Sequence, residues 1–246
     1  IGLLYSAFTY FLGFKVNSGE YKLMGLAPFG KPKYVDKIKN NLVKIFDDGS
    51  FHLNMKYFDY CTNLKMTNQK FNNLFAQKPR DFRRTLNQKD MDIASSVQKV
   101  IEEIIIKIVR NIKLENDVDN LCLSGGVALN CVSNSKIVES DIFKNIWIQP
   151  ASGDAGGCIG AALSVYYLML DNKRKIFPEV DSMKGALLGP KFYRNEIIND
   201  LKESNAIFLE KSENEIINEV AQLLHEGKAI GWMNGRMEFG PRSLGN

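Results

Sequence analysis

Two adjacent glycines, Gly125 and Gly126, stand between an apolar run and a helix-compatible sequence in VDNLCLSGGVALNCVSN, residues 118–134. The short apolar run at 121–123 is typical of a buried strand, and the glycines allow a sharp turn into the helix. Without a Cβ atom at either position, a ligand can approach the main chain closely, and the N–H groups that open the helix favour phosphate or another anion. No complete phosphate-loop or dinucleotide fingerprint accompanies the glycines. A plain strand-to-helix turn is therefore the alternative.

A second strand, glycine loop and helix follow in NIWIQPASGDAGGCIGAALSVYYLML, residues 145–170. Asp154 lies at the apex of this loop, and the apolar helix is predicted from Cys158 onward. Because ligands of open α/β sheets bind where strands end and helices begin, two such loops in series indicate one shared cleft. The alternative for Asp154 is a carboxylate that caps the helix starting near Cys158.

These loops and two further motifs resemble those of one protein family. LSGGVALN and QPASGDAGGCIGAAL are preceded by NSGEYKLMGLAPFGKPKY and followed by GWMNGRMEFGPRSLGN, in the family's order and from one end of the chain to the other. The chain resembles the O-carbamoyltransferases, which include nodulation-type and antibiotic-tailoring carbamoyltransferases. Its first domain is similar to the tRNA threonylcarbamoyl-transferase fold, within the actin-like ATPase and sugar kinase superfamily.

The resemblance implies an α/β fold with two domains. Residues 1–175 are expected to be the later part of an actin-like ATPase (ribonuclease H-like) carbamoyltransferase domain. Residues 185–246 are expected to begin a second α/β domain, the C-terminal domain that forms carbamoyl-adenylate, with the boundary near residues 171–187. The sequence opens on Ile1 and stops inside a glycine-rich motif. We therefore expect a fragment that is inactive by itself.

The resemblance also implies a reaction. Carbamoyl phosphate and ATP, with Mg²⁺, would give a carbamoyl-adenylate, and a hydroxyl group of a sugar or natural product would then attack that mixed anhydride in the actin-like domain. Two alternatives stay open. One is a tRNA threonylcarbamoyl-transferase-like enzyme, and the other is an actin-like-fold kinase or nucleotide-binding module.

The family's nucleotide-binding positions can be carried onto this chain by its motifs. The implied contacts to ATP come from Glu20, Lys22, Gly30, Gly125, Gly126 and Asn130. For the first three, a solvated turn with a charge pair is the alternative. In the last motif, Arg236 and Arg242 are the implied catalytic residues that recognise phosphate, because a guanidinium offers paired donors in a planar fork. Their alternative is a pair of surface charges in a glycine-rich turn.

Asp154 matches the family's aspartate ligand to a metal, implied to be Fe²⁺ or another divalent ion, and it is counted among the catalytic residues. The family completes that site with histidines in an HxxxH-like segment. His52 and His225 do not have this spacing, so we expect the histidines upstream of Ile1 and weak metal binding by this chain alone. Residues 51–89, rich in turn formers, resemble the family's variable insertion, where the acceptor could be contacted.

Composition narrows the classes of partner. The net charge is only +4 over 246 residues and the lysines are scattered, which argues against a dedicated nucleic-acid surface. No apolar run is long enough for a membrane span. The four cysteines have no CxxC spacing, which favours reduced thiols in a cytoplasmic protein over a zinc site. Assembly into a homodimer stays open.

Hydrophobic periodicity predicts a helix over residues 2–14, another within 32–48 and the clearest one over 90–112. In this last helix Gln98 and Glu102 are assigned to the wetter side. The helix is expected to pack beside the first glycine loop as scaffold.

Local motifs mark the later elements. A short helix is predicted over 195–204, and Ser212 with Glu215 forms a capping box before a further helix that Gly227 ends. Residues 229–240 are predicted to form a hairpin around an Asn-Gly turn.

Overall fold

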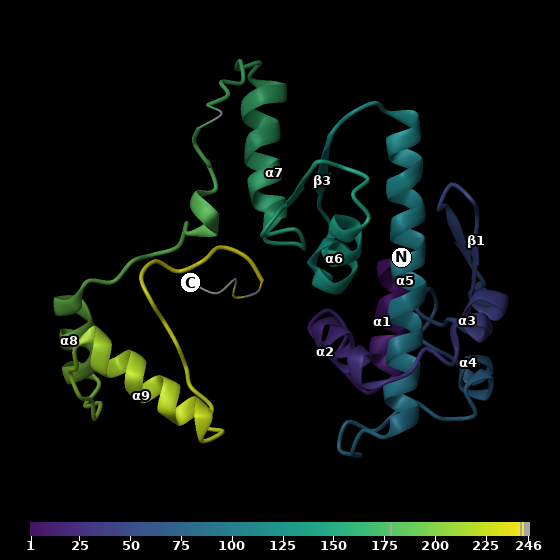
Figure 1. Cartoon of the computed structure of the whole chain (residues 1–246), viewed down its shortest axis with the longest axis horizontal. Helices are drawn as coiled ribbons and strands as arrows, with labels where there is room; N and C mark the ends of the chain where they lie inside the picture. The colour runs from purple at the N-terminus through teal and green to yellow at the C-terminus, as the bar shows by residue number, and fades with distance from the viewer. Residues whose placement is uncertain (178, 242, 244–246) are drawn as a thin grey trace. The chain divides into compact units, whose positions relative to one another are not determined.

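A computed structural model describes residues 1–177, 179–241 and 243 of the chain (Figure 1). It divides into two compact units, Ile1–Asp154 and Ala155–Asn246. The described part is a mixed α/β structure, mostly helical, with two small two-stranded sheets. In the first unit the elements are α1 Gly2–Phe11, α2 Glu20–Leu26, η1 Ala27–Phe29, α3 Val35–Asn41, β1 Val43–Ile45, β2 Phe51–Leu53, η2 Met55–Tyr57, α4 Gln69–Leu74, α5 Gln88–Glu115, β3 Asn120–Leu123, η3 Gly126–Leu129, α6 Cys131–Glu139 and β4 Asn145–Ile148.

Helix α5 is the axis of the first unit, and α1, α2, α3 and α6 pack against it (Figure 1). Its 28 residues extend the predicted helix at both ends, and a capping box between Asn87 and Asp90 fixes where it begins. The assignment of Gln98 and Glu102 to the wetter side was wrong, because both are buried. They lie under α1 and α6, which an isolated helix pattern does not reveal. The apolar face buries Ile93, Ala94, Val97, Val100, Ile101 and Ile104.

An aromatic cluster joins α1 to α4 on one side of this axis. Phe11 and Phe71 have ring centroids 5.0 Å apart in an edge-to-face arrangement, and Phe8 and Phe75 also contact the Phe71 ring. Edge-to-face pairs at this spacing add to the free energy gained by burying the rings. The predicted first helix is confirmed, and it ends at Phe11.

The sequence within 32–48 forms a shorter helix than predicted. Helix α3 ends at Asn41, and β1 then pairs antiparallel with β2, with Val43 opposite Leu53. Gly49 has a φ of 84° in the turn between the strands, a conformation that glycine adopts without steric cost. The β-branched residues Val43 and Ile45 favour the strand, although Val43 also lies at helical spacing from Val35.

The loop after η1 is fastened to the first turns of α5. Asp92 accepts hydrogen bonds from the main-chain N–H of Lys31 at 2.8 Å and from Gln88 at 2.9 Å, and its carboxylate pairs with Lys33 at 2.7 Å. Burial raises the pKa of Asp92, but these hydrogen bonds, led by that from Lys33, outweigh the effect and lower the pKa to about 2.

We predict that Asp92→Asn removes a pH-dependent part of the stability. A carboxylate whose pKa is lowered on folding stabilises the protein above its unfolded pKa of about 4, and that stabilisation is lost as the pH falls through about 2. The variant should unfold about 1.5 kcal/mol more easily near neutral pH, with the difference shrinking in acid. Thermal unfolding of both proteins across pH 2 to 7 measures this; a constant difference would contradict it.

In the second unit α7, Gly156–Ser164, continues as the π-helix η4, Val165–Met169, and so begins two residues before the predicted Cys158. The predicted helix near 195–204 is confirmed as α8, Arg194–Glu203. The capping box of Ser212 and Glu215 is confirmed at α9, Glu213–His225, as is the left-handed Gly227 beyond it. A short 3-10 turn, η5, spans Lys184–Ala186.

The predicted hairpin over 229–240 was wrong. Arg236 instead forms an antiparallel bridge with Lys191, and the N–H groups of Gly189 and Phe239 donate to Met237 and Ala186. The Asn-Gly turn is a local preference, but the backbone groups after it find their partners in the segment around 186–191. The domain boundary near 171–187 stays a prediction.

Candidate functional site

Strands β3 and β4 run parallel, with Asn120 opposite Asn145 and Leu123 opposite Ile148. Helix α6 connects them. The strands of the two strand-loop-helix units predicted from the sequence therefore lie in one sheet, and the first unit includes the chain up to Asp154. Both strands end at the same edge, where the N–H of Gln149 donates to the Leu123 carbonyl at 3.0 Å. The loops that follow β3 and β4 therefore start side by side.

A hydrogen bond joins the two loops directly. The N–H of Gly125 donates to the carbonyl of Ser152 at 2.8 Å. Gly125 has a φ of 98°, where a side chain would be strained. A Cβ atom built on Gly125 or Gly126 would meet nothing within 4 Å, so the main chain here borders open space.

Asn130 links this loop to α6. The glycine pair leads first into η3, and α6 begins only at Cys131, with Asn130 as its N-cap. The Asn130 side-chain oxygen accepts from the N–H of Ser133 at 3.0 Å. Asn130 is 8% exposed, and its amide also exchanges hydrogen bonds with Gln98.

Helix α2 lies next to the start of α6. The sulfur atoms of Met24 in α2 and Cys131 in α6 are 3.8 Å apart. Glu20, the first residue of α2, accepts hydrogen bonds from Ser6 and from the N–H of Asn17, each at 2.9 Å. Lys22 is exposed. The structure thus brings the helix that carries two predicted nucleotide contacts close to the helix that follows the first glycine loop.

The other predicted site residues lie outside the first loop and α2. Gly30 packs against the backbone of Met91 in α5. Asp154 is exposed at the end of the second loop and is not the N-cap of α7, a position that Ala155 occupies. Arg236 donates to the Gly189 carbonyl at 2.6 Å in the second unit. Arg242 lies outside the described residues.

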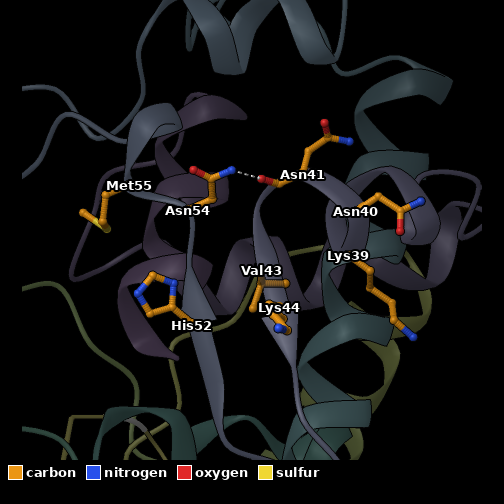
Figure 2. Close-up of a pocket in the computed structure, with 8 residues that line it drawn as sticks. All are labelled: Lys39, Asn40, Asn41, Val43, Lys44, His52, Asn54 and Met55. Carbon is orange, nitrogen blue, oxygen red and sulfur yellow. Dashed lines mark hydrogen bonds between the residues drawn. The ribbon is translucent and has the colours of Figure 1, made fainter.

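A shallow pocket of about 320 Å³ opens beside the β1–β2 hairpin (Figure 2). Figure 2 shows His52 and Asn54 on one strand segment, and the Asn54 amide donates to the Asn41 carbonyl at 2.8 Å. Lys39, also in the lining, is held by Glu103 at 2.8 Å. None of the predicted site residues lines this pocket.

Two stretches of the chain match models of known protein families. The model described as carbamoyltransferase N-terminus matches residues 1–163, and that described as carbamoyltransferase C-terminus matches residues 221–246. The chain belongs to the carbamoyltransferase family. This confirms the family that the motifs resemble.

Relatives of this carbamoyltransferase chain match it from end to end. An uncharacterised protein of Synechocystis is 53% identical over the whole chain, which covers 40% of that protein. Nodulation protein NolO of Bradyrhizobium diazoefficiens is 32% identical, and NolNO of Sinorhizobium fredii is 30% identical, again over the whole chain and over 42% and 34% of those proteins. The chain therefore spans less than half the length of these relatives.

The implied metal can be tested against the donors present. Within the ranges that the structure describes, no three His, Cys, Asp or Glu side chains gather closely enough to hold a metal ion. Asp154 stands exposed in its loop. The described residues of this carbamoyltransferase chain thus do not fit an iron site by themselves. Over the same ranges, no helix has the length and apolar character needed to cross a membrane.

Two residues of the site were missed by the sequence analysis. Gln98 is 4% exposed beneath the first loop, and Ser152 is 3% exposed in the second. Gln98 lies one turn from both Ala94 and Ile101 of the buried face, but its burial depends on where α1 and α6 pack, which this spacing does not show. For Ser152 the sequence offered no signal, because its contact to Gly125 uses only the main chain.

We predict that Ser152→Ala leaves the fold intact and raises its stability by up to about 1 kcal/mol. The Ser152 hydroxyl is buried with no hydrogen-bond partner in the described part of the chain, and an unsatisfied buried polar atom costs free energy. The main-chain bond to Gly125 survives the change. Urea unfolding measures the effect; a loss of more than 1 kcal/mol would show that the hydroxyl has a stabilising partner.

Proposed function

We propose that this chain is part of an ATP-dependent O-carbamoyltransferase, which moves a carbamoyl group from carbamoyl phosphate through carbamoyl-adenylate to a hydroxyl group. Family membership supports the class of reaction. The observation that carries the site is the hydrogen bond between Gly125 and Ser152, which ties two glycine loops together at the open edge of parallel strands. The parallel β3–α6–β4 unit supports an actin-like ATPase core for residues 1–175.

On the nucleotide side, the proposal uses the main chain of the first loop. Gly125 and Gly126 leave room for a phosphate or ribose to reach the backbone. Glu20 and Lys22 on the neighbouring α2 are the proposed further contacts, and Mg²⁺ would accompany the ATP phosphates.

The transfer step needs an activated carbonyl. Carbamoyl phosphate would first lose phosphate to water, and the resulting carbamate would displace pyrophosphate from ATP to give carbamoyl-AMP. The acceptor oxygen then bonds to the carbonyl carbon as AMP departs and the hydroxyl proton is released. Donors aimed at the developing oxyanion stabilise such a transition state. Asp154 remains the proposed ligand for Fe²⁺ or another divalent metal, with its partner histidines supplied from outside these residues.

The second unit is proposed to begin the domain that forms the adenylate, over residues 185–246. The C-terminal family model covers both Arg236 and Arg242. Arg236 is anchored at one nitrogen by the Gly189 carbonyl. This anchor supports a fixed orientation for phosphate recognition, since a guanidinium presents several donors in one plane.

The proposed acceptor is a hydroxylated sugar or natural product, and two relatives are named nodulation proteins. The hairpin beside the pocket of Figure 2, whose strand β2 carries His52, is the proposed place of acceptor contact. Four free cysteines fit a cytoplasmic setting. A nucleic-acid partner is not proposed, and assembly as a homodimer stays open.

The test is transfer of an isotopically labelled carbamoyl group. The protein expressed from its complete reading frame is incubated with ATP, Mg²⁺, ¹³C-labelled carbamoyl phosphate and a panel of aminoglycosides and oligosaccharides. Mass spectrometry should find the label attached to a hydroxyl group of an acceptor. A phosphorylated acceptor without label would favour the kinase. In a parallel incubation with tRNA, threonine and bicarbonate, threonylcarbamoyl-adenosine on the tRNA would favour the tRNA-modifying enzyme.

A further inference from the structure

A buried polar network lies beneath the first glycine loop, in the otherwise apolar core of the first unit. Gln98 of α5 is at its centre. Its side-chain oxygen accepts from the Tyr5 hydroxyl at 2.8 Å and from the Asn130 amide at 3.0 Å. Its side-chain nitrogen lies 3.2 Å from oxygen atoms of Glu102, Asn130 and Ser133. The network therefore joins α1 and α5 to the residues at the start of α6.

Every member of this network is largely withdrawn from solvent, with an exposed fraction of 8% or less. Burial, more than the partly offsetting hydrogen bond to Asn130, raises the pKa of Tyr5 well above its ordinary value. Tyr5 is thus a neutral donor at physiological pH. Buried polar groups that are mutually satisfied hold one another in a single arrangement, because any other leaves a group unpaired at a high cost.

Asn130 is the point at which this network reaches the loop. Its oxygen accepts from the Ser133 N–H and from Gln98, and its nitrogen donates to Gln98. The N–H of Asn130 itself donates to the Val127 carbonyl at 2.9 Å, and that of Ala128 donates to Gly125 at 2.9 Å. Asn130 is therefore both the last residue of this hydrogen-bonded turn, through its main chain, and a member of the buried network, through its side chain.

We propose that Gln98 is a positioning residue for nucleotide binding, which holds Asn130 so that the backbone of the Gly125–Asn130 loop is presented to the ligand in one conformation. This inference rests on the proposed function. It assigns the direct contacts with the nucleotide to the loop backbone and gives the Asn130 side chain a supporting part, because its polar atoms are engaged within the protein. A preorganised loop binds more tightly, since no ordering cost is left for the binding step.

The test compares ATP affinity and stability in the protein expressed from its complete reading frame. Gln98→Met keeps the side-chain volume and removes the network's centre. Ser96→Ala is the matched control, because Ser96 also lies in α5, is fully buried, and bonds Asp92 and Tyr34 instead of the loop. Calorimetric titration with Mg²⁺-ATP should give about fivefold weaker binding for Gln98→Met and unchanged binding for Ser96→Ala. Amide hydrogen exchange at residues 125–130 should accelerate only in the first variant.

If Gln98→Met does not fold, Tyr5→Phe tests the positioning role instead. This change removes one hydrogen bond to Gln98 and keeps the aromatic ring. It should weaken ATP binding about threefold. Affinity equal to that of the wild type in a folded variant, with unchanged exchange, would overturn the positioning role while leaving the nucleotide site in place. A wild-type protein that binds no ATP would overturn both the positioning role and the proposed function.

Discussion

Gly30→Ala is expected to lower the free energy of unfolding of the first unit by about 3 kcal/mol or more. A Cβ atom at this position would overlap the carbonyl group of Met91 and lie 2.6 Å from the main-chain nitrogen of Asp92. These are backbone atoms of the central helix α5 and cannot turn aside as a flexible side chain can. Asp92 also holds the loop from the other side through Lys31.

Thermal unfolding is the measurement, with an expected fall in Tm of about 6–12 °C. Gly25→Ala is the control, because its Cβ would meet nothing within 4 Å and alanine favours the helix in which Gly25 lies. The sequence motif assigns Gly30 to the nucleotide. A Gly30→Ala protein with normal stability and weakened ATP binding would support that role and contradict packing as the reason for this glycine.

Gly126→Ala is expected to weaken ATP binding at least about tenfold, or about 1.4 kcal/mol, while the protein stays folded. Gly126 is not one of the described glycines with a left-handed φ. Its added methyl group would meet no protein atom within 4 Å. The methyl group would instead occupy space into which the ligand is proposed to reach. Calorimetric titration with Mg²⁺-ATP measures the loss.

Gly2→Ala is the matched control for this experiment. Gly2 opens α1, and its Cβ would make one ordinary contact, at 3.6 Å with Val127 of the same loop. It should leave the affinity for ATP unchanged. Equal affinity in Gly126→Ala and the wild type would place the nucleotide away from this loop.

Much of the fold could be predicted because the decisive interactions are local. The apolar face of α5 repeats at helical spacing, and the capping box at Ser212 is contained in four residues. The β1–β2 hairpin was missed because Val43, which alternates with Ile45, also lies at helical spacing from Val35. The Asn-Gly hairpin failed because the partner of Arg236 is Lys191, far away in the sequence.

The site could be predicted as far as chain topology determines it. Parallel strands end at one edge, so the meeting of the loops after β3 and β4 follows from the order of strand and helix. The burial of Gln98 does not follow, because it depends on where α1 and α6 lie on α5. The metal proposed at Asp154 gains no further donors from the fold, since the described residues provide no cluster of three His, Cys, Asp or Glu side chains.

The most direct test of the central claim is to identify the nucleotide product. The protein expressed from its complete reading frame is incubated with ATP, Mg²⁺ and carbamoyl phosphate, and nucleotides are separated by chromatography. We predict AMP and pyrophosphate that appear only when carbamoyl phosphate is present and that decrease in Gly126→Ala. ADP as the product, or no turnover of ATP, would contradict the adenylate route and favour a kinase or a binding module.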